Sequence, residues 1–306
     1  MALTEQQRRQ ILDTLKNTAL VHGAVTYPAE CRAFLTLCRT ETVAMPPVDG
    51  HAYTVYVCTA KNRTPRCPVH INIHGGGFIG PHAENDAMYS AWLADAIGGI
   101  VVDVDYTTSA AAPWPVAFDQ CYETGRWAAA HMAAWDADPA RLSMGGYSAG
   151  GVLTAGAALK AAQTGDFSLC LEVLGYAPLD NATHPLYKQL GYRRMMAWQR
   201  ERAFADLYFD GETAARAADP YASPACAPDA MLARLPRTMI CTAAGCNFRF
   251  EDEEYARRLI AQGVEVSVER FAGTNHGFIP HFMPGWRPAA EWIAQAIRSA
   301  GVPDAV

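Results

Sequence analysis

The segment Gly146-Tyr147-Ser148-Ala149-Gly150-Gly151 contains the pattern G-x-S-x-G. Residues 141–147 have the apolar composition of a buried strand, and residues 149–163 have the apolar spacing of a helix. A serine at a sharp turn between a strand and a helix is held in a strained conformation, which requires small residues on both sides of it. The segment therefore predicts a nucleophile at Ser148; a glycine-rich turn without chemistry is the alternative.

Predicted strands alternate with predicted helices on either side of this segment. Such alternation is typical of parallel strands whose connecting helices cover both faces of the sheet. It predicts an α/β fold with a mostly parallel central sheet. The predicted strands are 52–58, 69–74, 99–105, 141–147, 169–177, 238–243 and 264–271, and the predicted helices are 5–20, 83–97, 116–135, 149–163, 251–262 and 288–299.

The composition is that of a globular protein. The chain has 306 residues, of which half are hydrophobic, and a formal charge of −6. These values exclude disorder as the main state, and the acidic balance gives no electrostatic basis for binding nucleic acid. No apolar stretch reaches the length of a membrane span, and residues 1–10 are too polar for a secretory signal.

The cysteine pattern bears on location and on metals. Nine cysteines are present, an odd number, and none forms a C-x-x-C pair. In a chain of this size they indicate reduced thiols and a cytoplasmic location. The paired spacings of zinc ligands are missing, and His70 and His74 share a strand face without an evident third ligand, so we expect no metal site.

A second glycine-rich segment, His74-Gly75-Gly76-Gly77-Phe78, follows the predicted strand 69–74. Consecutive glycines let backbone N–H groups point into a site without interference from side chains, and such donors stabilise an oxyanion. The Ala149 N–H, at the start of the helix after Ser148, is a further candidate donor. The alternative is a dinucleotide-binding turn, since residues 75–80 also match G-x-G-x-x-G, but that reading leaves Ser148 unexplained.

A candidate general base lies near the end of the chain. Asn275-His276-Gly277-Phe278 follows the last predicted strand, 264–271, and His276 comes after Ser148 in chain order. A histidine in a loop at the carboxyl edge of the sheet can take the proton from the serine hydroxyl. A histidine with a packing role only is the alternative.

One insertion interrupts the alternation of strands and helices. Residues 181–236 contain no predicted strand and are rich in Tyr, Trp, Met and Arg. An insertion of this length in an α/β domain is typical of a lid over the active site. We therefore predict a catalytic core made of 46–180 and 237–306, with a cap formed by 181–236 and by a helical N-terminal part, 1–45.

Three motifs in this order resemble the hormone-sensitive-lipase-like family of α/β-hydrolases: H-G-G-G-F at 74–78, G-Y-S-A-G-G at 146–151 and H-G-F at 276–278. The resemblance extends from about residue 40 to the end of the chain. It implies an α/β-hydrolase fold with a helical cap, carboxylesterase activity and no cofactor. By the same resemblance the oxyanion-hole donors would be Gly76, Gly77 and Ala149.

The sequence departs from the family at the catalytic acid. Counting back from the helix that follows, Cys246 occupies the position where the family has Asp. A neutral thiol does not stabilise the imidazolium as a carboxylate does. We therefore expect another acid, with Asp180 first and Asn247, as a neutral orienting group, second; Glu251, third, is expected to point to solvent.

These features together predict a serine carboxylesterase that hydrolyses small, short-acyl esters through an acyl-enzyme, with Ser148 and His276 as its reacting residues. The expected partner is a small-molecule ester, and a homodimer remains open. The alternative is a catalytically weakened or non-hydrolytic binding protein on the same scaffold, because of Cys246. Retention of both reacting residues argues against that alternative.

Overall fold

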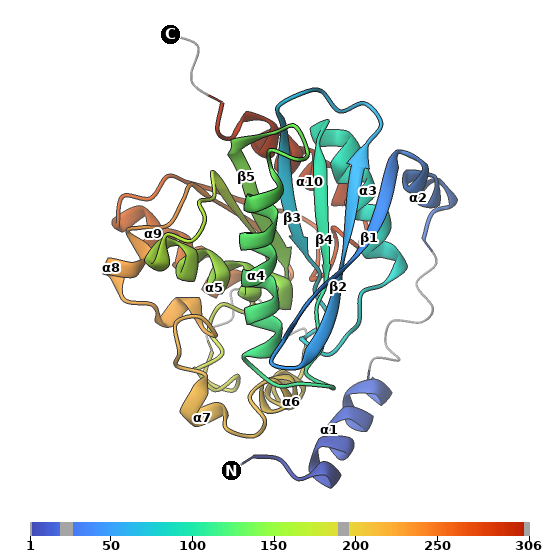
Figure 1. Cartoon of the computed structure of the whole chain (residues 1–306). Helices are drawn as coiled ribbons and strands as arrows, with labels where there is room; N and C mark the ends of the chain where they lie inside the picture. Colours follow the sequence, from blue (N-terminus) through green and yellow to red (C-terminus); the bar gives the residue numbers. More distant parts are fainter. Residues whose placement is uncertain (1, 19–26, 189–195, 303–306) are drawn as a thin grey trace.

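A computed structural model describes residues 2–18, 27–188 and 196–302 of the chain. Its centre is an eight-stranded sheet with the order β1-β2-β4-β3-β5-β6-β7-β8 (Figure 1). The pairs β1/β2 and β2/β4 are antiparallel, and all further neighbours are parallel. The strands are β1 Cys38–Val48, β2 His51–Ala60, β3 Cys67–Ile73, β4 Ile100–Asp105, β5 Ala137–Tyr147, β6 Leu171–Gly175, β7 Thr238–Ala243 and β8 Val266–Phe271.

Helices cover both faces of the sheet, so the predicted α/β architecture with a mostly parallel sheet is confirmed (Figure 1). One face packs against α3 and α10, and the opposite face packs against α4, α5 and α9. The helices are α1 Glu5–Thr18, α2 Ala29–Ala33, α3 Glu84–Ile97, α4 Val116–His131, α5 Ala149–Thr164, α6 Trp198–Tyr208, α7 Thr213–Arg216, α8 Asp229–Leu232, α9 Arg249–Ala261 and α10 Trp286–Ser299, with short 3₁₀ turns at Phe34–Thr36 (η2) and Pro224–Cys226 (η3).

The central strands are buried over their whole length. Every residue of β3, β6 and β7 is buried, as expected for strands with helices on both sides. The parallel strands end at a common edge, and the loops after β3, β5, β7 and β8 meet there. This edge is where the two glycine-rich segments and the loop of His276 come together.

The predicted cap differs from the structure at both of its boundaries. Among the described residues of the N-terminal part, 1–45, α1 packs beside α6 of the insertion (Figure 1). Residues 38–45 belong instead to β1, an edge strand that sequence patterning missed because it is mostly exposed and contains two prolines. At the other end, η3 and α8 fall within 181–236 but pack against α5 and α9 of the core. The part of the insertion at 189–195 lies outside the described residues.

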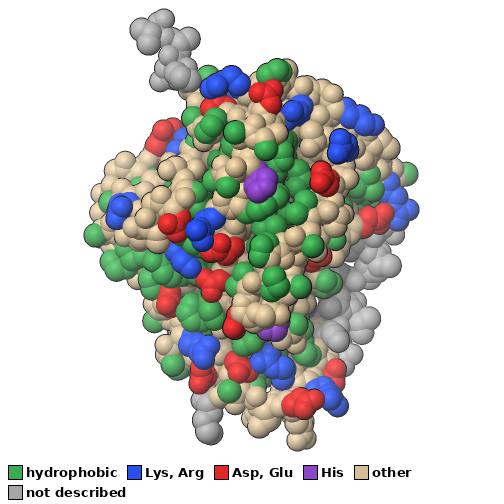
Figure 2. Space-filling view, viewed as in Figure 1, with side chains coloured by type: hydrophobic (Ala, Val, Ile, Leu, Met, Phe, Trp, Pro, Cys, Tyr) green, Lys and Arg blue, Asp and Glu red, His purple; other side chains and the backbone are tan. Residues whose placement is uncertain are grey.

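The surface in view carries charges of both signs. Figure 2 shows Lys and Arg side chains interspersed with Asp and Glu over this face, with hydrophobic side chains between them. Within the described ranges, the structure has no helix that is both long and apolar enough to cross a membrane.

A buried polar network lies under the loop that follows β3. The His82 side chain, only 9% exposed, contacts the fully buried Asp103 carboxylate at 2.7 Å, Nε2 to Oδ2. Asp103 also accepts a hydrogen bond from Asn72, which in turn reaches Ser90 on α3. Burial alone would lower the pKa of His82, but the Asp103 carboxylate outweighs burial and raises that pKa to about 9. The charged pair thus connects the glycine loop to β4 and α3.

This pair makes the stability of the fold depend on pH. The folded-state pKa of His82 exceeds the unfolded value near 6.5, so its stabilising charge is fully present below pH 6.5 and is lost as the pH rises through about 9. Between pH 6.5 and 10, the free energy of unfolding should fall further in the wild type than in His82→Gln, by an amount on the order of 3 kcal/mol. Urea unfolding at several pH values measures this difference. Parallel curves for the two proteins would contradict the assignment.

Candidate active site

Ser148 lies at the turn between β5 and α5, with backbone angles of φ 55° and ψ −123°. This conformation is strained for a residue with a side chain, and close packing of the neighbouring glycines maintains it. A Cβ atom on Gly146 would lie 2.3 Å from the Gly150 carbonyl oxygen, and one on Gly150 would lie 2.1 Å from the Ile73 oxygen. The small residues predicted on both sides of Ser148 are therefore required by direct contact between the turn and β3.

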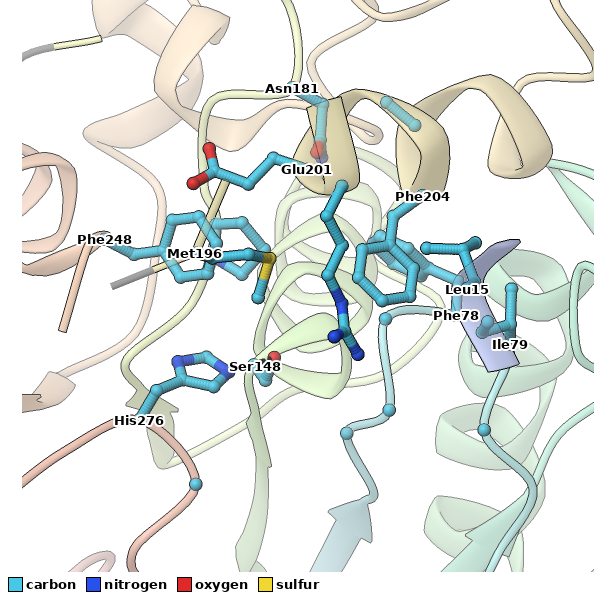
Figure 3. A pocket seen from close by; sticks show the side chains of 18 of the residues that line it. Leu15, Phe78, Ile79, Ser148, Asn181, Met196, Glu201, Phe204, Phe248 and His276 are labelled. Atoms are coloured by element: carbon cyan, nitrogen blue, oxygen red, sulfur yellow. Dashed lines mark hydrogen bonds between the residues drawn. The ribbon is translucent and has the colours of Figure 1, made fainter. Parts of the chain in front are cut away.

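His276 faces Ser148 from the loop after β8. Its Nε2 lies 2.8 Å from Ser148 Oγ, so the two residues that the sequence pairs as base and nucleophile are within hydrogen-bond distance (Figure 3). The rings of Tyr176 and Phe248 meet the imidazole edge-on, with centroids 5.1 and 5.4 Å away. These contacts from two other loops fix the plane of the imidazole.

The glycine segment after β3 passes beside the nucleophile turn. Gly76 and Gly77 have positive φ angles of 114° and 61°, and a Cβ on Gly75 would lie 3.2 Å from Ser148 Cβ. His74 fixes the start of the segment: its Nδ1 donates to the Gly75 carbonyl at 2.7 Å, and its ring stacks on Tyr106. Burial lowers the pKa of His74 to about 4, which keeps this imidazole neutral.

The sulfur of Cys246 lies 3.2 Å from Nδ1 of His276. Because Nε2 must accept the serine proton, Nδ1 carries the hydrogen of the neutral ring and donates it to the sulfur. Burial, with a further contribution from Asp252, raises the pKa of the Cys246 thiol well above its usual value. The position where the family has its acid therefore contacts the histidine, as the acid would, but holds a neutral thiol.

The residues expected to replace the acid have other partners. Asp180 Oδ1 accepts hydrogen bonds from the backbone N–H groups of Ala182 and Thr183. The carboxylate therefore caps its own turn, an ordinary role for Asp. Asn247 Nδ2 donates to Glu201 Oε1 at 2.6 Å and so joins the loop after β7 to the cap helix α6. Among the described residues, no hydrogen bond joins His276 to Asp180 or Asn247.

Glu251 also differs from its expected position in solvent. Its carboxylate accepts the Asp180 backbone N–H and forms an ion pair with Lys188 at 3.1 Å, with only 13% of its side chain exposed. Burial raises its pKa to about 7, against the opposing effect of Lys188. Glu251 thus fastens the start of the cap insertion to the first turn of α9.

Ser148 and His276 open into a cavity of about 540 Å³ between the sheet edge and the cap. Figure 3 shows Met196 and Phe248 on the His276 side of this cavity, with Phe204 and Leu15 on the opposite side. The Phe204 ring packs so closely on the glycine segment that a Cβ on Gly77 would lie 2.5 Å from it. The cap therefore forms the wall that faces the candidate oxyanion donors.

The sequence predicted the pairing of Ser148 with His276, which lie in contact in the structure, but it did not predict which residues form the cavity wall. Leu15 and Phe204 belong to the apolar side chains of the N-terminal helix and of the insertion, and the sequence does not show which of these side chains face inward. One feature of the sequence indicated the contact of Cys246 with His276: Cys246 occupies the position where the family has its acid. Nothing in the sequence indicated the contact of His82 with Asp103, because Asp103 is 21 residues away along the chain, on β4.

The dinucleotide alternative does not fit this geometry. In that reading, a carboxylate at the end of the next strand, Asp103 or Asp105, would bind a ribose hydroxyl. Asp103 is fully buried and paired with His82, and Asp105 accepts a hydrogen bond from the Tyr56 hydroxyl. The helix after the glycine segment begins only at Glu84, beyond the last glycine of the pattern at Gly80. Within the described residues, no group of three or more His, Cys, Asp or Glu side chains could hold a metal ion.

Comparison with known proteins agrees with this geometry. A profile of the alpha/beta hydrolase fold family matches residues 70–280. Esterase LipI of Mycobacterium tuberculosis is 29% identical over 73% of this chain and 68% of its own length. Hormone-sensitive lipase of Bos taurus is 33% identical over 31% of this chain and 13% of its own length.

A solved structure extends the similarity to the whole fold. Carboxyl esterase 2 of Tuber melanosporum superposes with a TM-score of 0.78 at 27% identity, covering 87% of this chain and 88% of its own. The matched profile, the sequence relatives and this structure agree with one another on the α/β-hydrolase fold. The chain belongs to the hormone-sensitive-lipase-like family of α/β-hydrolases.

Proposed function

We propose that this protein is a serine carboxylesterase that hydrolyses small, short-acyl esters through an acyl-enzyme intermediate. The single observation that carries the proposal is the 2.8 Å contact of Ser148 Oγ with His276 Nε2 at the floor of the cavity. Esterases among its relatives and structural neighbours support carboxylic ester hydrolysis as the reaction class. The non-hydrolytic alternative has no support in these comparisons.

In the first step, Ser148 Oγ attacks the ester carbonyl carbon while His276 Nε2 takes the hydroxyl proton. The carbonyl oxygen becomes an oxyanion, which the backbone N–H groups of Gly76, Gly77 and Ala149 stabilise by hydrogen bonds. Support for these donors comes from the positive φ angles of the two glycines beside Ser148 and from the position of Ala149 at the start of α5.

In the second step, the bond between the carbonyl carbon and the alcohol oxygen breaks. The imidazolium of His276 returns its proton to the departing oxygen, and the alcohol leaves. A water molecule, deprotonated by the same imidazole, then attacks the acyl-enzyme and releases the carboxylic acid and free Ser148. Ester and water are consumed, and no redox step or cofactor is involved.

The volume of the cavity and the apolar side chains in its wall support the proposal that the substrates are compact and apolar. A volume of about 540 Å³ lies within the range typical of small-molecule sites. Phe204 closes one end of the cavity against the glycine segment, and Met196 and Phe248 line the side next to His276 (Figure 3). These apolar side chains beside the nucleophile support the proposed short acyl chain.

The nucleophile is tested by Ser148→Ala with p-nitrophenyl acetate and p-nitrophenyl butyrate as substrates. The variant removes the attacking oxygen, so kcat should fall by a factor of about 10⁴ or more. Ser299→Ala, at an exposed position on α10, is the control and should keep wild-type rates. If Ser148→Ala retains wild-type activity on either ester, the mechanism is wrong.

The oxyanion donors are tested by Gly77→Ala, whose methyl group would meet both a positive φ and the Phe204 ring. Displacing one N–H donor should lower kcat by a factor of about 10²–10³. Gly50→Ala is the matched control, because Gly50 also has a positive φ (77°) but has open space around its Cβ position, on the turn between β1 and β2. Equal losses of kcat in the two variants would show that backbone strain, not the oxyanion, is responsible.

A further inference from the structure

The sulfur of Cys246 receives two hydrogen bonds. The Phe248 backbone N–H donates to Sγ at 3.4 Å, and His276 Nδ1 donates to it at 3.2 Å. The Arg249 backbone N–H, in the first turn of α9, adds a further interaction with the sulfur. Donors therefore converge on Sγ from the α9 N-terminus and from the catalytic histidine, so that the sulfur acts as an acceptor.

This arrangement gives Cys246 one of the two roles of a catalytic acid: it orients His276 but does not stabilise its positive charge. As an acceptor it fixes the tautomer and the plane of His276, which leaves Nε2 free of hydrogen and directed at Ser148. As a buried neutral group it supplies no charge to stabilise the imidazolium that forms when the serine proton moves. Among the described residues, the group that contacts Nδ1 of this base is therefore a neutral thiol and not a carboxylate.

The charged groups around this pair do not replace that support. Asp252 is fully buried, its carboxylate accepts the Ala177 backbone N–H, and burial raises its pKa well above the usual value, which favours its neutral form. Glu251 is engaged with Lys188. Tyr176, whose ring faces the imidazole, has a pKa raised well above 10 by burial and stays neutral.

We propose that Cys246 is the positioning residue of His276, acting as a neutral hydrogen-bond acceptor in place of a carboxylate, and that the site consequently prefers esters with acidic leaving groups. This inference rests on the proposed serine esterase function. The alkoxide of an alkyl ester is a poor leaving group, so it departs only when the imidazolium of His276 protonates it. An aryl or enol ester releases a stable oxyanion, so its carbon–oxygen bond breaks with little proton transfer. The proton left on His276 Nε2 then passes to this oxyanion or to solvent before the imidazole deprotonates the water molecule.

The environment of Sγ is suited to an introduced carboxylate. Cys246→Asp places the new carboxylate beside the same N–H donors, at a helix N-terminus that favours negative charge. An opposite charge next to His276 should shift the acid-side midpoint of the kcat/KM pH profile upward by about 1 unit or more. The kcat/KM for ethyl butyrate should rise about tenfold or more, with a smaller gain for p-nitrophenyl butyrate, so that the aryl-to-alkyl preference falls.

Truncation tests the neutral hydrogen bond separately. Cys246→Ala removes the acceptor and should lower kcat about two- to tenfold, with KM nearly unchanged. Cys241→Ala is the matched control: it removes another buried thiol from the neighbouring strand β7, away from His276, and should leave kcat within twofold. Thermal unfolding of each variant separates a loss of folded protein from a loss of positioning.

Two results would overturn the inference. One is equal behaviour of Cys246→Ala and Cys241→Ala together with an unmoved pH midpoint in a folded Cys246→Asp. The other, decisive if Cys246→Asp does not fold, is equal kcat for Cys246→Ser, which keeps an acceptor, and Cys246→Val, which has none. Activity that depends on Ser148 but not on residue 246 refutes only this inference, whereas activity that persists in Ser148→Ala refutes the proposed function itself.

Discussion

The strained backbone of Ser148 is the constraint on which the rest of the site depends. A residue with a side chain at φ 55° costs of order 1–3 kcal/mol, and the surrounding structure must supply this energy. Here it comes from the direct packing of Gly146 and Gly150 on the turn and on β3, and from the buried strand and helix on either side. The result is a partly buried hydroxyl that opens into the cavity at a fixed point of the sheet edge, around which the other loops are arranged.

The cap is joined to this edge by polar contacts that cross between the two parts of the chain. Asn247, in the loop after β7, holds α6 through Glu201. Glu251, on α9, holds the insertion through Lys188, and Arg8, on α1, donates to the Ser109 carbonyl oxygen of the core. The apolar side chain of Phe204, on α6, packs on the glycine segment beside the nucleophile.

The sequence predicted those parts of the molecule that local pattern determines. The alternating strands and helices and the strand–turn–helix around Ser148 follow from periodicity and from glycines that no other residue could replace. Strand β1 was missed because an edge strand with prolines and exposed charges lacks the apolar pattern of a central strand. Residues 38–45 of this strand were assigned instead to the N-terminal part of the cap.

The candidate acid shows the limit of reasoning from residue type. Asp180 was preferred to Cys246 because a carboxylate is the better partner for a histidine, yet the partner is chosen by backbone geometry. The turn after β7 brings Cys246 to Nδ1, while the Asp180 carboxylate is taken by the N–H groups of its own turn. Such an outcome depends on loop conformations that no short motif encodes.

The most direct test of the account is covalent labelling of the nucleophile. The purified protein is treated with a fluorophosphonate, and the adduct is located by intact and peptide mass spectrometry. The account predicts one adduct per chain, on Ser148, with loss of esterase activity in proportion to labelling and no adduct in Ser148→Ala. Esterase activity that survives complete labelling of Ser148, or that disappears on labelling of another residue, would contradict it.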